Sequence, residues 1–304
     1  MAQSEPNRDN PRLGIALMLA FCAVIPFSDA LAKMLGDRIP LLQLIQIRFA
    51  AQLLLFLPLA LWLGHALFPS RRAVVLVFAR TVLQIGGLAA MFTALRFLPL
   101  ADAVAIAFVM PFIVLLLGHW FLHEEVGPRR LIACVVGFAG TLMVTQPSFA
   151  QVGWPALLPL AVAVIFALFT LVTRAISRDM TPIALQASSS LFGLPLLLPL
   201  IFFAVPGSPP PLSWVIPEGI DLWLWVLLGF TGAFGHWLMT ASLRFAPAST
   251  LAPMQYLEIP FATLLGWAFF RDLPNGLATA GIAVTLAAGL YIVLRERRVS
   301  AGAV

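Results

Sequence analysis

Several ionisable side chains lie inside long apolar stretches of this chain, and these are the residues best placed to do chemistry. In a segment that crosses a bilayer such groups are costly, so they usually face a partner, the interior of the helix bundle or a water-filled cavity. The apolar stretches contain Asp29, Lys33, Arg48, Arg80, His119, His236 and Glu258.

Asp29 and Lys33 are four residues apart and therefore share one face of a helix. Mutual neutralisation of the two charges is the favoured interpretation. The alternative is that an ammonium or carboxylate group of a bound substrate competes for one of them. Lys33 is also close enough to the expected helix end for its amine to reach the membrane surface.

Arg48 and Arg80 each lie within two turns of an expected helix end, so their side chains can also extend to the interface. That structural role is favoured. The functional alternative is a clamp for a carboxylate, because a planar guanidinium donates two parallel hydrogen bonds. Gln46 and Gln84 add neutral donors and acceptors on the same two segments.

Glu258 is the most sharply defined candidate, because it precedes Ile259-Pro260 in the middle of an apolar segment. A proline removes a backbone donor and frees carbonyl groups in the turn before it, here around Gln255 and Tyr256. Pro111 has the same effect in an earlier segment. Interrupted helices at matched positions point to a substrate site. A buried carboxyl group can carry a proton, so Glu258 is either a proton carrier or a structural acid.

His236 and Trp237 lie in the middle of another segment. Histidine titrates near neutral pH, which suits proton coupling, although a packed and hydrogen-bonded histidine is the favoured interpretation. Trp237 is far from either interface, so it either stacks on a planar substrate or packs. Phe166 and Ser189 could line the same cavity, but the favoured interpretation is that they pack against other helices or face lipid.

The composition identifies lipid as the solvent for much of the chain. Of 304 residues, 61% are hydrophobic and 10% are charged, whereas soluble domains average about 25% charged. The net charge of +5 comes mostly from arginine, and no basic stripe follows a polar face, so nucleic-acid binding is not expected. The two cysteines and the absence of HExxH, GxSxG and CxxC motifs predict no metal, no cofactor and no catalysis.

Ten segments are long and apolar enough to span a bilayer. They cover residues 13–35, 42–63, 73–95, 101–122, 130–146, 153–173, 182–203, 222–243, 249–270 and 276–294. With the N-terminus inside, twelve arginines fall on inner segments and three on outer connections, which predicts that both termini are cytoplasmic. The run Gly229-x-x-Gly232-x-x-Gly235 predicts close helix packing.

The second half of the chain repeats the first at a distance of 148 residues. Leu95-Arg96-Phe97 with Pro99 recurs as Leu243-Arg244-Phe245 with Pro247, and Glu124 recurs as Asp272. The shift moves the chain by five segments, an odd number, so equivalent segments run in opposite directions. The sequence thus predicts two inverted five-helix repeats, residues 1–147 and 148–304, that enclose a shared polar cavity.

These motifs resemble the EamA family of the drug/metabolite transporter superfamily over nearly the whole chain. The resemblance rests on the two Leu-Arg-Phe-x-Pro segments, the Pro-Phe pairs at Pro111 and Pro260, and the acids Glu124 and Asp272, the second of which is more usually glutamate. It implies an all-α carrier of the bacterial inner membrane, most similar to the exporters of aromatic amino acids.

The expected function is therefore a secondary transporter that exports amino acids or related small metabolites by alternating access, driven by protons or by the substrate gradient. An integral-membrane enzyme acting on lipid or isoprenoid groups is the alternative. Its nearest residue set is Glu124-Glu125 with His119 and His123. A sensor or assembly factor that moves no substrate is a third possibility.

Overall fold

The structure is a computed structural model that describes residues 10–124, 126–145, 153–177, 179–202, 214–271 and 275–302. These residues form helices and turns, with no β-strand among them. The first half contains α1 (Pro11–Leu35), α2 (Leu41–Trp62), α3 (Arg71–Ala94), α4 (Leu100–Ala107), α5 (Met110–Leu122) and α6 (Pro128–Thr145). The second contains η1 (Trp154–Ala156), α8 (Leu157–Ile176), α9 (Pro182–Phe202), α10 (Ile220–Phe245), α11 (Ala248–Leu251), η2 (Ala252–Leu257), α12 (Glu258–Phe270) and α13 (Gly276–Gly302).

Local sequence signals explain where several helices begin. The side chain of Asn10 accepts a hydrogen bond from the amide of Leu13, and Pro11 occupies the first position of α1. Ser70 caps α3 in the same way, and Asn275 caps α13. Such caps satisfy amide groups that have no partner within the helix. Each predicted segment coincides with one helix or with two or three consecutive helical elements.

Two segments are interrupted where the sequence analysis places a break. The fourth segment divides into α4 and α5 at Phe108 and Val109, directly before Pro111. The ninth divides into α11, a 3₁₀ turn at Ala252–Leu257 and α12, directly before Pro260. The breaks lie within the bundle, and the hydroxyl of Tyr256 donates to the carbonyl of Phe108, which a continuous helix would have used.

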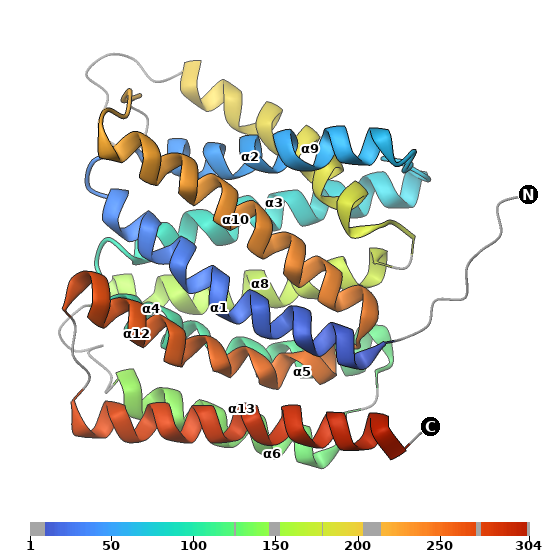
Figure 1. Ribbon diagram of the computed structural model, residues 1–304, viewed down its shortest axis with the longest axis vertical. Coiled ribbons are helices and arrows are strands. Elements are labelled where there is room, and N and C mark those ends of the chain that lie inside the picture. Colours follow the sequence, from blue (N-terminus) through green and yellow to red (C-terminus); the bar gives the residue numbers. More distant parts are fainter. Residues whose placement is uncertain are drawn as a thin grey trace, which may run out of the picture.

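The halves pack through pairs of helices taken from each (Figure 1). α1 lies along α10, α3 along α8, α2 along α9, and α6 along α13. The two left-handed residues other than glycine in the described chain are His123, which ends α5, and Arg271, which ends α12. They are 148 residues apart, the same distance that separates the repeated sequence motifs.

Close approach of helices depends on the glycine run in α10. A Cβ at Gly229 would lie 2.9 Å from the carbonyl oxygen of Ile47 in α2, and one at Gly235 would lie 2.7 Å from Ile25 in α1. Gly232 faces the guanidinium of Arg48. The packing role predicted for this run is confirmed.

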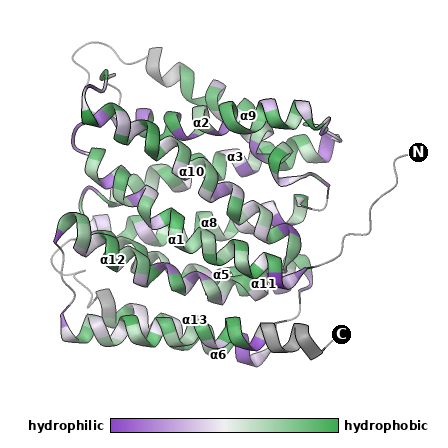
Figure 2. Cartoon of the chain, in the orientation of Figure 1, coloured by the Kyte–Doolittle hydropathy of each residue, from purple (hydrophilic) through white to green (hydrophobic). Residues whose placement is uncertain are grey.

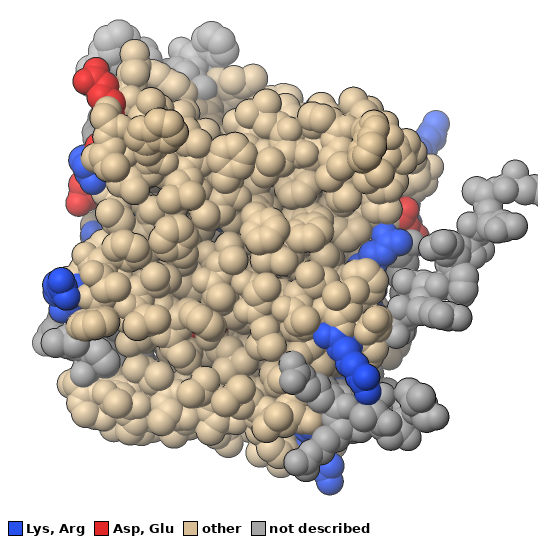
Figure 3. All heavy atoms as spheres, viewed as in Figure 1, with Lys and Arg blue, Asp and Glu red and all other residues tan. Residues whose placement is uncertain are grey.

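The surface is that of a membrane protein. Six described helices, α1, α2, α3, α8, α10 and the Gly276–Arg295 part of α13, are long and apolar enough to cross a bilayer. Hydrophobic residues dominate these helices (Figure 2). On the face shown in Figure 3, lysine, arginine and acidic residues gather at two opposite ends with an uncharged surface between them. Large apolar side chains such as Leu54, Val75 and Trp223 are also exposed on the described helices.

Candidate functional site

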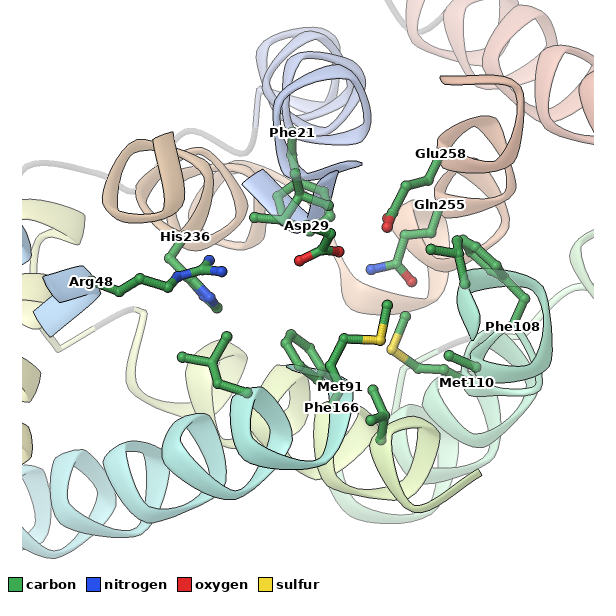
Figure 4. A pocket seen from close by; sticks show the side chains of 15 residues that line it. Phe21, Asp29, Arg48, Met91, Phe108, Met110, Phe166, His236, Gln255 and Glu258 are labelled. Carbon is green, nitrogen blue, oxygen red and sulfur yellow. The ribbon is translucent and has the colours of Figure 1, made fainter. Parts of the chain in front are cut away.

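A cavity lies between helices of both halves, beside the two interruptions (Figure 4). The empty space between its lining atoms, open solvent included, is about 610 Å³, of which about 70 Å³ can hold the centre of a water molecule. Five of its lining side chains are polar or charged: Asp29, Arg48, His236, Gln255 and Glu258. The others are apolar or aromatic: Phe21, Ile25, Leu88, Met91, Val104, Ala107, Phe108, Met110, Val162 and Phe166. A largely apolar lining with few polar groups is typical of a small-molecule site.

Helical periodicity explains which side chains face the cavity. Phe21, Ile25 and Asp29 are spaced by four residues and form one face of α1. Phe108 and Met110 flank the break between α4 and α5, while Gln255 and Glu258 lie in and directly after the 3₁₀ turn. Residues at both interruptions therefore line the cavity.

Arg48 is the most unusual residue of the cavity. Its side chain is 2% exposed, yet none of its three guanidinium nitrogens has a hydrogen-bond partner in the described chain. The group lies 5.5 Å from the centre of the Phe92 ring, and Gly232 leaves room for it beside α10. A buried guanidinium without bonds is costly, so Arg48 is ready to donate to a ligand or to water.

His236 presents a second set of free polar atoms. Both ring nitrogens are buried and have no partner among the described residues. The ring stacks on Phe166 at 6.1 Å with an interplanar angle of 24°, and its edge meets Phe169 at 5.6 Å. The aromatic contacts hold the imidazole in place without using its hydrogen-bonding atoms.

Acidic and amide groups occupy the rest of the cavity. Figure 4 shows Arg48 and His236 projecting from one side, Gln255 and Glu258 from the opposite side, and Asp29 lying between them on the helix that also carries Phe21. The side-chain oxygen of Gln255 is buried without a partner in the described chain. One side of the cavity thus carries a cation, and carboxyl groups lie beside and opposite it, which suits a ligand with both acceptors and donors.

Six residues predicted for the site come together here: Asp29, Arg48, Phe166, His236, Gln255 and Glu258. Lys33 does not line the cavity; its amine donates to the carbonyl oxygen of Leu98 at 3.0 Å and lies over Phe270. No ion pair joins these two described residues, Asp29 and Lys33, so the favoured mutual neutralisation is not observed. Gln46 instead donates to the carbonyl oxygen of Leu197.

The remaining predicted residues bond or pack outside the cavity. Gln84 donates to Gln52, and Ser189 accepts from Arg80. Trp237 stacks between Phe56 and Phe234. Tyr256 is fully enclosed, and its hydroxyl donates to the carbonyl oxygens of Phe108 and Cys134. Through this bond Tyr256 holds the backbone of Phe108, whose side chain lines the cavity.

The sequence analysis missed most of the apolar lining. Phe21 and Ile25 could have been found from their spacing to Asp29, and Phe108 and Met110 from their position beside Pro111. Val162 stands four residues before Phe166 on α8 and follows the same rule. Leu88 stands four residues after Gln84 on α3, but Gln84 itself does not line the cavity, and Met91 and Val104 carry no such signal.

The residue set of the alternative enzyme hypothesis is engaged in structural contacts. Glu124 accepts backbone hydrogen bonds from Ala248 at 3.2 Å and Ser249 at 2.8 Å, and pairs with Arg174 at 3.4 Å. His119 contacts the carbonyl oxygen of Glu124. Glu125 and Asp272 lie outside the described residues. Within the described chain, no group of three or more potential ligands could hold a metal ion.

An all-α membrane fold with a cavity beside two interrupted helices is an arrangement found in secondary transporters. Comparison with known proteins gives the particular family. The chain belongs to the EamA-like transporter family, whose profile matches residues 12–146 and again residues 153–295.

Several named transporters are similar to this chain. The riboflavin transporter of Rhizobium johnstonii is 32% identical over 72% of this chain and 70% of its own length. The riboflavin transporter of Brucella anthropi is 28% identical over 92% and 98%. The S-adenosylmethionine uptake transporter of Rickettsia prowazekii is 22% identical over 94% of each. A crystal structure with a TM-score of 0.75 and 18% identity covers 96% of this chain and 99% of its own, and shares its fold.

Proposed function

We propose that this protein is a secondary transporter of small aromatic metabolites, with riboflavin as the first candidate. The observation that carries the proposal is a cavity with aromatic walls in which Arg48, His236 and Gln255 keep free hydrogen-bonding atoms. The flavin ring is flat and has carbonyl oxygens along one edge, and its side chain carries hydroxyl groups. Stacking on Phe166 and bonding to Arg48 would suit such a molecule.

The transport cycle we infer is alternating access by two inverted five-helix repeats, residues 1–147 and 148–304. The double match to the family profile and the left-handed residues His123 and Arg271 support the repeat. The pairing of α1 with α10 and of α8 with α3 supports a two-fold relation between the halves. Rocking of one half against the other would expose the cavity to each side in turn.

The proposed orientation places both termini in the cytoplasm, with ten spans in the bacterial inner membrane. α1 begins and α13 ends at the same end of the bundle (Figure 1). The excess of arginine on the connections at that end supports the cytoplasmic side.

Aromatic and bulky neutral amino acids are the second candidate cargo. The opposed charges of the cavity favour them, because Arg48 could bind the carboxylate while Asp29 or Glu258 binds the ammonium group. Riboflavin carries neither charge, so it would bond to Arg48 through a neutral carbonyl oxygen and would form no ion pair with Asp29 or Glu258. Glu258 would additionally carry a proton if transport is coupled to the pH gradient.

Counterflow in proteoliposomes tests the proposal. Vesicles loaded with unlabelled compound receive labelled riboflavin, S-adenosylmethionine, phenylalanine, tryptophan or leucine, with and without a pH gradient. We expect saturable counterflow of riboflavin that Arg48→Gln reduces. Flux of phenylalanine or tryptophan with none of riboflavin would replace the first candidate by the second, and absence of any saturable flux would overturn the proposal.

A further inference from the structure

A second guanidinium, that of Arg80, is held in an entirely different way from that of Arg48. Arg80 is fully enclosed, and it donates to Thr173 at 3.0 Å, Ser189 at 2.6 Å, Gln186 at 3.3 Å and Thr240 at 3.0 Å. These acceptors come from α8, α9 and α10, so Arg80 of α3 links four helices. We call these five residues the Arg80 cluster.

Every acceptor in the Arg80 cluster is neutral. No carboxylate of the described chain forms an ion pair with Arg80, whereas Arg174 pairs with Glu124. An ion in a low-dielectric interior is costly even when it is hydrogen-bonded, and charged residues kept inside membrane segments usually mark the path of a substrate or ion. Joining four helices needs only neutral donors, so the positive charge requires a further explanation.

The Arg80 cluster is separated from the cavity by one aromatic side chain. The guanidinium lies 4.6 Å from the centre of the Phe169 ring, and the same ring contacts His236 at 5.6 Å. Thr240 accepts from Arg80 and donates to the carbonyl oxygen of His236, one turn earlier on α10. Phe169 is buried and lies in contact with both His236 and Arg80.

The cluster lies toward the end of the bundle that carries the termini. α8 ends at Ile176 and α10 at Phe245, so Thr173 and Thr240 are close to the ends of their helices. The end of α10 meets the beginning of α1, where a Cβ at Gly14 would lie 2.7 Å from Ala246. Asp29 lies near the other end of α1. The order along the bundle is therefore Asp29, His236, Phe169 and the Arg80 cluster.

We propose that the Arg80 cluster is a second substrate-binding site on the transport path, which we call the second station. It is closed in this conformation and is occupied when the protein opens at the end of the bundle that carries the two chain termini, the terminal side. The inference rests on the proposed transport function. An electron-rich group of the cargo, a carboxylate or a ring carbonyl, leaves Arg48, passes Phe169 and replaces Ser189, Gln186 or Thr240 as acceptor for Arg80. Hydroxyl and amide acceptors hold the guanidinium more weakly than a carboxylate would, so they can be exchanged in each cycle.

Cysteine accessibility tests this station without depending on the cargo. Ser189→Cys is made after Cys22 and Cys134 are replaced by alanine, and a membrane-impermeant thiol reagent is applied to each side of oriented vesicles. Arg80 stays in place, so the variant is expected to fold. We expect labelling from the terminal side alone. Labelling from neither side would identify a permanent structural cluster, and labelling from the opposite side would place it elsewhere on the path; both overturn the station.

Ser190→Cys is the matched control, because Ser190 is equally buried and its hydroxyl bonds only within α9. We expect it to remain unlabelled. Equal labelling of the two variants would mean exposure through local unfolding and would overturn the assignment. Labelled Ser189→Cys in a protein that moves no riboflavin would retain the station while removing riboflavin as cargo.

Kinetics with riboflavin give the second readout. Arg80→Lys keeps the charge but loses the planar set of donors. We expect its half-saturation concentration to rise about tenfold or more at the terminal side, the value for one lost bond to a charged group, and to stay unchanged at the other side. Equal changes at both sides would contradict a station used from one side.

Discussion

Substitution of Gly232 by alanine should weaken substrate binding without unfolding the protein. A Cβ at this position of α10 would lie 2.6 Å from Cζ and 2.8 Å from Nη2 of Arg48. Contacts this short cannot persist, so the guanidinium must move. The atoms it meets are the flexible end of a side chain that borders a cavity, and for that reason the backbone of α2 can stay in place.

The expected magnitudes separate binding from stability. Overpacking of a core costs about 1–3 kcal/mol, and the low end applies here because the clash involves a movable group. Replacement of a helical glycine by alanine stabilises the helix by about 0.5–1 kcal/mol. The two effects oppose each other, so the free energy of unfolding should change little. A lost hydrogen bond from Arg48 to cargo costs about 1.5–3 kcal/mol, which is roughly a tenfold to hundredfold loss of affinity.

The assay measures riboflavin counterflow and the unfolding temperature in detergent for the same preparation. Gly266→Ala in α12 is the matched control, because a Cβ there has no heavy atom within 4 Å. We expect normal half-saturation for the control and a raised value for Gly232→Ala, at similar unfolding temperatures. Unchanged half-saturation in Gly232→Ala would show that Arg48 does not contact the cargo and would refute the reasoning.

Three further predictions concern coupling, support and topology. Glu258→Gln should leave the protein folded in the membrane but reduce flux and remove its response to a pH gradient; normal flux at every pH would eliminate Glu258 as a coupling residue. Tyr256→Phe loses two buried bonds and should lower the unfolding free energy by about 1–3 kcal/mol, measured by thermal unfolding, with half-saturation unchanged. Single cysteines at Asp179 and Glu218 should react with an impermeant reagent from opposite sides, the first from the cytoplasm; labelling from one side would contradict the proposed topology.

The helices were predictable because their signals are local. The segment expected at 42–63 is α2 at Leu41–Trp62, and the one at 182–203 is α9 at Pro182–Phe202. Length, hydropathy and flanking prolines fix such bounds without reference to any other helix. The breaks near Pro111 and Pro260 fall beside prolines, which remove a backbone donor. Proline alone does not decide where a helix breaks, because Pro26 and Pro58 lie inside the continuous helices α1 and α2.

The site was only partly predictable, because the direction of a side chain is a property of the assembled bundle. The sequence analysis gave Arg48 and Arg80 the same two interpretations, yet of the two only Arg48 lines the cavity. The difference depends on what faces each residue: Gly232 leaves room beside Arg48, while hydroxyl groups surround Arg80. Ser189 and Tyr256 likewise bond to partners on other helices.

The proposed roles of Arg48 and Arg80 would account for the absence of a carboxylate ion-pair partner for either residue in the described chain. An arginine paired with a buried carboxylate would be costly to separate, because breaking such a pair leaves an uncompensated charge. Arg48 instead has free donors and shares the cavity with Asp29 and Glu258, and Arg80 is bound by neutral groups. Neither guanidinium must abandon an ion pair to receive cargo. Arg174, which pairs with Glu124 beside α11, lies outside the cavity, where a fixed contact does not hinder exchange.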